Sequence, residues 1–202
     1  MKKNVLKGIM GACIITGLII VQVSPTFADV KDYVTENNHV LIGGVTGRHY
    51  YITKATESKY VAPINNAIND WKSATGNLVS FTRTYDTYEV EAQATIRAKS
   101  YPNYPYNDAN GYTEFYNKKI DIDKVQPNYC DWQYTEVHLN TYRIQNYSSD
   151  LIKGVVAHEM GHTFGLDDNN SNPGTIMCQT GSGRNVTQPQ SGDVAGINYL
   201  YK

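Results

Sequence analysis

The chain has 202 residues, of which 41% are hydrophobic and 18% are charged, with a formal net charge of −1. This length and composition predict one globular domain with a sizeable core rather than a disordered or multidomain chain. No run of basic residues and no glycine-rich phosphate loop is present. The sequence therefore gives no support to nucleic acid or nucleotides as partners.

Residues 1–28 have the pattern of a secretory signal peptide. Lysines precede an apolar stretch from Gly8 to Val23, and small residues follow it, so we expect cleavage after Ala28. A membrane anchor is the alternative, but the stretch is interrupted by polar residues and is short for a bilayer span. We expect a secreted, extracellular protein without stable membrane insertion, whose mature chain carries 15 basic and 19 acidic side chains.

The residues after the leader divide into an arm and a domain. Residues 29–47 show little helical period and predict an N-terminal arm, with regular structure beginning near Arg48 in a domain of residues 48–202. Apolar residues at helical spacing predict a helix over 59–76. β-Branched, aromatic and alternating patterns predict strands at 48–55, 78–85, 92–100 and 135–144.

Residues 101–132 are rich in Tyr, Pro and Asn and predict a long loop with one short strand, KKIDI, at 118–122. Within this loop, NDANGYTE at 107–114 has too few carboxylates to favour a calcium site over a solvated turn. A calcium ion is therefore unsupported by the sequence.

A helix that begins at Ser148 or Ser149 carries the most informative motif, VVAHEMGHTFGLDD at 155–168. His158 and His162 are four residues apart, so both imidazoles project from one helical face and can bind one tetrahedral cation. Glu159 is rotated by about 100° from His158, where a carboxylate reaches a metal-bound water. The alternative is an ordinary amphipathic helix with two hydrogen-bonded histidines.

The continuation of this motif resembles the extended zinc signature of the metzincins, in which Gly165 ends the helix and a third ligand follows. The resemblance implies that Asp168 is this ligand, with Asp167 as the rival. Met177 falls where that clan has its Met-turn, an apolar floor beneath the metal.

Two further segments resemble matrixin catalytic domains. QPQSGDVAGINYLY at 188–201 is similar to their last helix, which includes Asp193. WQYTEVHLNTY at 132–142 is similar to their strand above the cleft, which implies an edge strand that pairs with an extended substrate.

Several features depart from the matrixin pattern. Aspartate replaces the usual third histidine, as in snapalysin-type secreted proteases, and Gln179 stands where a tyrosine assists catalysis. No cysteine-switch propeptide is recognised. The long loop lacks the pattern that holds structural zinc and calcium, so those ions are not expected.

The resemblance implies an α+β fold, a metzincin-like domain with a twisted mixed sheet, an active-site helix and a C-terminal helix. It also implies a monomeric zinc endopeptidase that acts on protein or peptide substrates. In this hypothesis His158, His162 and Asp168 bind one Zn²⁺, and Glu159 is the general base. The alternatives are a secreted zinc-containing binding protein without proteolytic activity and an enzyme that acts on a non-peptide bond.

Two further residue types leave alternatives open. Cys130 and Cys178 either form a disulfide, which export permits, or remain thiols. His138 lies on the strand above the cleft, where a histidine bonded to a neighbour is favoured over one that faces substrate.

Overall fold

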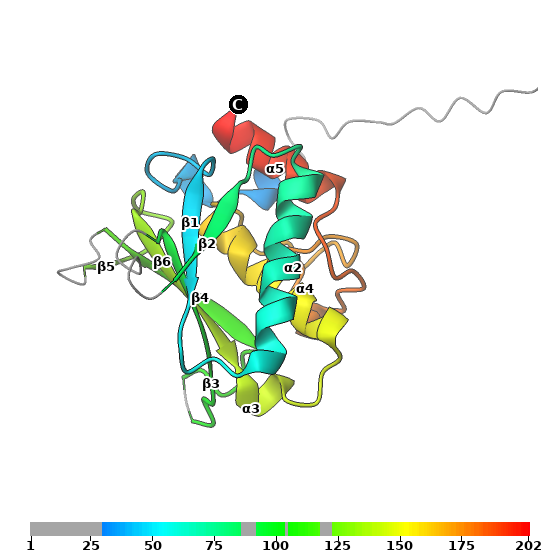
Figure 1. The fold of residues 1–202 in the computed structure, drawn as a ribbon. Helices are drawn as coiled ribbons and strands as arrows, with labels where there is room; N and C mark the ends of the chain where they lie inside the picture. The colour runs from blue at the N-terminus through cyan, green and yellow to red at the C-terminus, as the bar shows by residue number, and fades with distance from the viewer. Residues whose placement is uncertain (1–29, 86–91, 104, 118–122) are drawn as a thin grey trace, which may run out of the picture.

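The computed structural model describes residues 30–85, 92–103, 105–117 and 123–202. Within them a six-stranded mixed β-sheet has two long helices on one side, α2 (Ser58–Ala74) and α4 (Ser149–Thr163) (Figure 1). The predicted α+β class is confirmed. The predicted signal peptide at 1–28 and the strand expected at 118–122 lie outside the described residues.

The sheet has the strand order β2-β1-β3-β6-β4-β5. Four strands are mutually parallel where they pair, and the last two are antiparallel to their neighbours. A strand is present at each of the predicted positions near 48–55, 78–85, 92–100 and 135–144, but the end of the last one is wrong, because Thr141–Ile144 is a short helix. The six strands of the sheet are Arg48–Ile52 (β1), Phe81–Thr84 (β2), Ala94–Lys99 (β3), Gly111–Tyr116 (β4), Lys124–Val125 (β5) and Tyr134–Asn140 (β6).

Two expectations about the sheet are wrong. The segment 101–132 is not a loop throughout, because it contains β4 and β5. β6 is not an edge strand, because it lies between β3 and β4. The reason is that β4 forms through cross-strand contacts with β6, such as the stacking of Tyr112 on His138 at 4.3 Å between ring centroids, and local composition does not reveal such pairing.

The N-terminal arm is part of the folded body. Val34 forms an isolated β-bridge with Leu166, and Leu41 forms one with Trp132. The arm also contains two 3-10 turns, η1 (Lys31–Tyr33) and η2 (Glu36–Asn38). The first strand begins at Arg48 as predicted, but order extends into the arm before it, because apolar side chains of the arm are buried against the domain.

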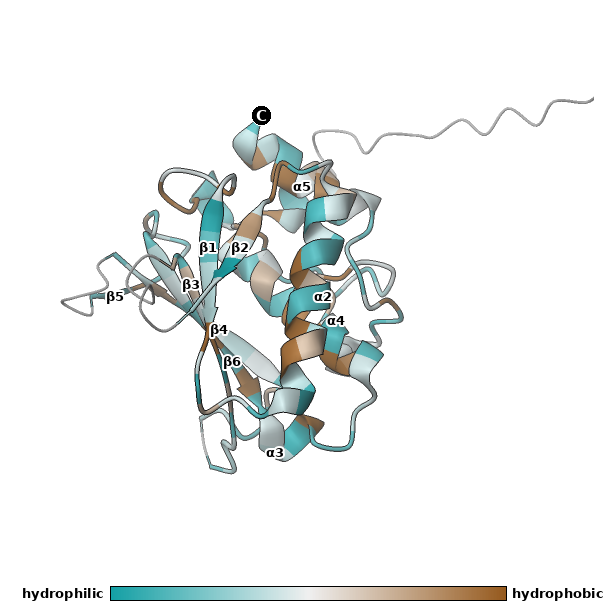
Figure 2. Cartoon of the chain, viewed as in Figure 1, coloured by the Kyte–Doolittle hydropathy of each residue, from teal (hydrophilic) through white to brown (hydrophobic). Residues whose placement is uncertain are grey.

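Helix α4 runs through the centre of the molecule, beside α2. The Trp71 indole N–H of α2 donates to the carbonyl of Ala157 in α4 at 2.9 Å, and the Trp71 ring meets Phe164 edge to face. Figure 2 shows hydrophobic and hydrophilic residues alternating along α2, as expected for a helix with one face on the core. Ten of the fifteen residues of α4 are buried, so its position is fixed from several sides.

The C-terminal helix α5 (Ser191–Tyr201) is present as predicted, and a short helix α3 (Thr141–Ile144) follows β6. Helix α5 begins with a capping box between Gln190 and Asp193. No helix among the described residues is long and apolar enough to cross a membrane.

Close packing in the middle of α4 generates a prediction about Gly161. A β-carbon there would collide with the Met177 sulfur and lie 3.3 Å from the Trp71 ring. We expect Gly161→Ala to lower the free energy of unfolding by about 1–2 kcal/mol, because overpacking outweighs the gain in helix propensity. Denaturant unfolding measures it. Gly181→Ala is the control, because a β-carbon there has no neighbour within 4 Å, and equal stability of the two variants would contradict the packing argument.

Candidate metal centre

Helix α4 and the turn after it bring three side chains to one point. Ser148 caps the start of the helix by accepting a bond from a backbone N–H of the first turn. His158 and His162 project from one face of the last two turns. Gly165 has φ +94°, a left-handed conformation that ends the helix and turns the chain back, so that Asp168 meets the two histidines.

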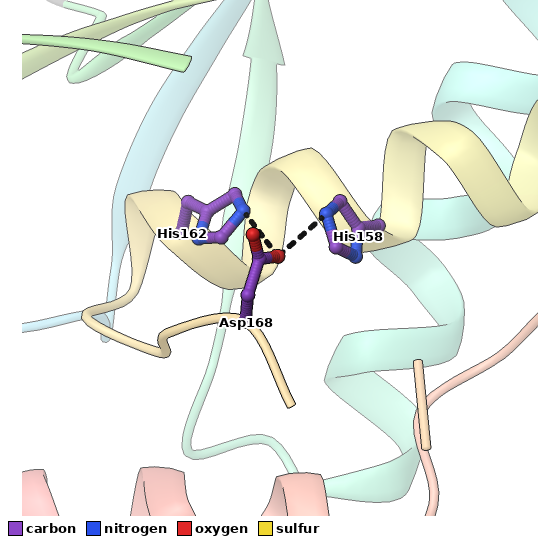
Figure 3. A group of neighbouring side chains, drawn as sticks. All are labelled: His158, His162 and Asp168. Atoms are coloured by element: carbon purple, nitrogen blue, oxygen red, sulfur yellow. Dashed lines mark ion pairs between the residues drawn. The ribbon is translucent and has the colours of Figure 1, made fainter. Parts of the chain in front are cut away.

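The three side chains converge at distances that suit one metal ion. Asp168 Oδ1 lies 3.2 Å from His158 Nε2 and 3.5 Å from His162 Nε2 (Figure 3). Two donors bound to one tetrahedral zinc at 2.0–2.1 Å are separated by about 3.4 Å. The two observed distances are close to this separation, and all three donor atoms lie within 4.8 Å of one another. The site predicted from the sequence is thus assembled in space.

Backbone carbonyls orient both imidazoles. His158 Nδ1 donates to the carbonyl of Ile176, and His162 Nδ1 donates to that of Leu166, each at 2.9 Å. Because a carbonyl only accepts, the hydrogen is assigned to Nδ1 in the neutral rings, and the Nε2 lone pairs face each other and Asp168. This tautomer is the one that binds a metal through Nε2.

The carboxylate of Asp168 is held on one side and unsatisfied on the other. Gln179 Nε2 donates to Oδ2 at 2.7 Å, whereas Oδ1 is buried and has no hydrogen-bond partner of good geometry among the described residues. A buried anionic oxygen between two ring nitrogens fits a cation. In the sequence Gln179 is only a departure from the family pattern, and its contact with Asp168 is not predictable from it.

The charges of the group shift its pKa values in opposite directions. Burial lowers the pKa of His162, but the close contact with Asp168 and the charges of Glu159 and Asp168 outweigh burial and raise the pKa to about 9. Burial raises the pKa of Asp168, but the two imidazoles hold it well below its usual range. Because a metal replaces the bound protons, affinity for a cation falls as the pH falls.

Glu159 is buried beside the three potential ligands and is held by strand β4. Thr113 Oγ1 lies 2.9 Å from Glu159 Oε2 and 3.0 Å from its backbone carbonyl, and donates its one hydrogen to this pair. A β-carbon at Gly111 would lie 2.9 Å from both Cγ and Oε1 of Glu159, so glycine leaves room for the carboxylate. Sequence analysis missed both residues because it placed them in a loop.

Met177 and Asp193 stabilise the segments that carry the potential metal ligands. Met177 is fully buried and packs against Gly161, between the two histidines of α4. The Asp193 carboxylate accepts bonds from the hydroxyl of Thr175 and the backbone N–H of Ile176 and Met177. Burial raises the pKa of Asp193, although these bonds oppose the shift. The acidic residue recognised in the tail therefore anchors the predicted Met-turn to α5.

A cavity of about 560 Å³ opens over the group. Gly111, Tyr112 and Thr113 of β4 line it and, among the described residues, have no strand partner on the β5 side, because the ladder to β5 contains only Phe115 and Tyr116. Strand β4, rather than β6, therefore presents an edge to the cavity. The lining includes residues from the arm, the loop before β4, helix α4 and the segment after Met177, among them Thr35, Asp108, Val155, Asp167, Thr180 and Arg184.

Asp167, the rival ligand, has a different hydrogen-bond partner. Its carboxylate accepts the backbone N–H of Asp168 at 2.8 Å. The groups of potential ligands among the described residues include Asp168 with the two histidines and do not include Asp167.

A second group, Glu114, Glu136 and His138, lies on the face of the sheet turned away from α4. Lys124 lies 2.7 Å from Glu114 and Arg97 lies 2.9 Å from Glu136, so both carboxylates already have cationic partners. His138 Nδ1 bonds to the Tyr101 hydroxyl at 2.7 Å. The prediction of a strand histidine bonded to a neighbour is confirmed.

The two cysteines are not joined. Cys130 and Cys178 are both free, and the Cys178 thiol is 3.5 Å from the carbonyl of Gln179. Burial raises the pKa of the Cys178 thiol. Of the two alternatives left open by the sequence, the structure has the unpaired thiols.

Comparison with known proteins gives one family match and two similar solved structures. A family model described as Matrixin matches residues 48–202. A chain in the GM1-bound form of the ECX AB5 holotoxin has a TM-score of 0.53 and 12% sequence identity, over 86% of this chain and 90% of that chain. At this identity the likeness shows the fold alone.

High choriolytic enzyme 1, a hatching-enzyme zinc protease from the medaka fish Oryzias latipes, has a TM-score of 0.42 and 15% identity, over 85% of this chain and 94% of that chain. No curated protein shows significant similarity to the chain.

The coupling between His162 and Asp168 generates a prediction for the metal-free protein. We expect Asp168→Asn to lower the pKa of His162 from about 9 toward its ordinary value of 6.5. Since the folded-state pKa is the higher one, the stabilisation by protonated His162 is complete below about pH 6.5 and is lost as the pH rises through about 9. NMR titration of the imidazole resonances measures the shift. Asp167→Asn is the control, and an unchanged pKa in Asp168→Asn would refute the coupling.

Proposed function

The chain belongs to the matrixin family of zinc metalloendopeptidases, and from that premise we propose that it is an exported protease in which His158, His162 and Asp168 hold one catalytic zinc. The observation that carries this proposal is the convergence of two Nε2 atoms and one carboxylate oxygen within 4.8 Å of one another. When bound there, zinc acidifies a water molecule and polarises the carbonyl of the scissile bond. A His₂Asp site has one less net positive charge than His₃, and carboxylate-containing zinc sites are established catalysts.

We assign the proton transfers to Glu159. Its Oε2 is beside the Thr113 hydroxyl, while its Oε1 makes no hydrogen bond within the described residues and the side chain lines the cavity. One oxygen is thus oriented and the other is available to take a proton from the attacking water and pass it to the leaving amine. This division of roles supports Glu159 as the general base and then the general acid.

The edge of β4 is the proposed binding site for the peptide chain. An extended substrate that lies along Gly111–Thr113 forms main-chain hydrogen bonds with the unpaired edge, as a further strand of the sheet. It then crosses the cavity directly above Glu159 and the metal ligands. This role replaces the one that sequence analysis gave to residues 132–142.

Export of the protein rests on the leader pattern of residues 1–28, with lysines, an apolar stretch and small residues before Asp29. We propose that the mature protein acts outside the cell, with Asp29 as its first residue.

A secreted binding protein with a purely structural zinc is the second candidate. Glu159 argues against it, because a structural site needs no buried carboxylate that lines an open cavity beside the ligands. Cleavage of peptides by the purified mature chain, abolished by a chelator and restored by zinc, distinguishes the two candidates.

Replacement of Glu159 by Gln tests the assignment of the base. We expect kcat/KM for an internally quenched peptide to fall by about 10³-fold or more, because the proton acceptor is lost while the shape of the side chain is kept. Bound zinc, measured by atomic emission, should remain at the wild-type level. Glu57→Gln removes an exposed carboxylate and is the control. Wild-type turnover by Glu159→Gln would sink the mechanism.

The identity of the third ligand is tested by zinc content. We expect Asp168→Ala to lose bound zinc after dialysis against a weak chelator, because two imidazoles alone leave the cation under-coordinated. Asp167→Ala should retain it, because its carboxylate contacts a backbone N–H instead. Loss of zinc only in Asp167→Ala would make Asp167 the ligand.

A further inference from the structure

We infer that Arg184 forms a carboxylate-binding subsite in the cleft, so that substrates with a carboxylate beside the scissile bond are preferred. This inference rests on the proposed protease function. Among the described residues that line the cavity, Arg184 is the one lysine or arginine. It follows the turn η4 (Thr180–Ser182), on the segment that continues from Met177.

The Arg184 guanidinium is a partly buried cation with no counter-ion in the part of the chain that the structure describes. It donates to the carbonyls of Ile176 and Cys178 at 3.3 and 3.4 Å and to the hydroxyl of Thr180 at 3.1 Å, all neutral acceptors. No carboxylate among the described residues lies within ion-pair distance of it. Burying a charge without an opposite charge is unfavourable, so this side chain gains from an anionic ligand.

The remaining donors suit a carboxylate. Both bonds to carbonyls use Nη1 and the bond to Thr180 uses Nη2, so the Nε–H and one Nη2–H have no partner among the described residues. Two N–H groups of one planar guanidinium bind the two oxygens of a carboxylate side by side. Neutral amides and apolar side chains satisfy these donors less well.

The position of Arg184 relates the subsite to the reaction. Arg184 Nη1 donates to the carbonyl of Ile176, which also accepts from Nδ1 of His158. Arg184 therefore lies next to a proposed zinc ligand, and it lines the same cavity as Glu159. A substrate group that reaches Arg184 belongs to a residue close to the scissile bond.

The cavity lining also contains carboxylates. Apart from Glu159, these are Asp108, in the loop before β4, and Asp167, after the C-terminal end of α4. Both repel a substrate carboxylate, which leaves Arg184 as the position in the described lining that attracts one.

Two substrate groups present the same chemistry, an Asp or Glu side chain and the C-terminal carboxylate of a short peptide. Matched internally quenched peptides separate them. In the first pair, one peptide has Glu and the other has Gln at the positions next to the cleavage site. Both ends of these peptides are blocked. A second pair contains only neutral side chains and has a free or an amidated C-terminus.

The experiment compares kcat/KM for these peptides with the wild-type enzyme, Arg184→Gln and Arg184→Lys. We expect the wild type to prefer the carboxylate member of at least one pair by about 10-fold or more, and the ratio to fall to about one in Arg184→Gln. Arg184→Lys should keep a reduced preference, because it retains the charge without the fork of donors. The pair that shows the preference identifies the source of the carboxylate.

Arg143→Gln is the matched control, because it removes an equal charge from an exposed arginine outside the cavity lining and should leave the ratio unchanged. Equal wild-type rates within both pairs would overturn the inference, as would a wild-type ratio in Arg184→Gln. If Arg184→Gln does not fold, the wild-type ratios and Arg184→Lys decide. Absence of zinc-dependent cleavage of every peptide would instead refute the protease function itself.

Discussion

The convergence of one carboxylate oxygen and two imidazole nitrogens within a few ångströms is the constraint on which the rest of the structure depends. Each ligand needs a partner behind it, because a mobile side chain would lose this spacing. Leu166 and Ile176 supply carbonyls to the histidines, and Gln179 supplies an amide to the aspartate. All three partners lie after α4, so the turn at Gly165 delivers both the third ligand and its supports.

Asp193 connects the C-terminal helix to the candidate metal centre by hydrogen bonds. Asp193 accepts the N–H of Ile176, and the carbonyl of the same residue accepts from His158 and from Arg184. Two hydrogen bonds thus connect α5, through Ile176, to the imidazole of His158. This arrangement explains why a buried acid is retained near the chain's end despite its desolvation cost: it satisfies backbone donors of the turn that forms the floor of the site.

Sequence reasoning predicted the parts that depend on local spacing. The four-residue separation of the histidines, the cap at Ser148 and the positive φ of Gly165 each follow from the geometry of one helix and its end. The role of β4 did not follow, because a strand preceded by Asn and Pro is defined by pairing with β6 and by contact with Glu159. For the same reason the supports at Thr113 and Gly111 and the packing of the arm emerged only from the three-dimensional structure.

Anomalous diffraction at the zinc edge from crystals of the zinc-loaded protein tests the central claim most directly. Our account predicts one peak within bonding distance of His158 Nε2, His162 Nε2 and an Asp168 carboxylate oxygen, with Glu159 beside it and not bound to it. A peak bound to Asp167 instead of Asp168, or a peak only among Glu114, Glu136 and His138, would contradict it.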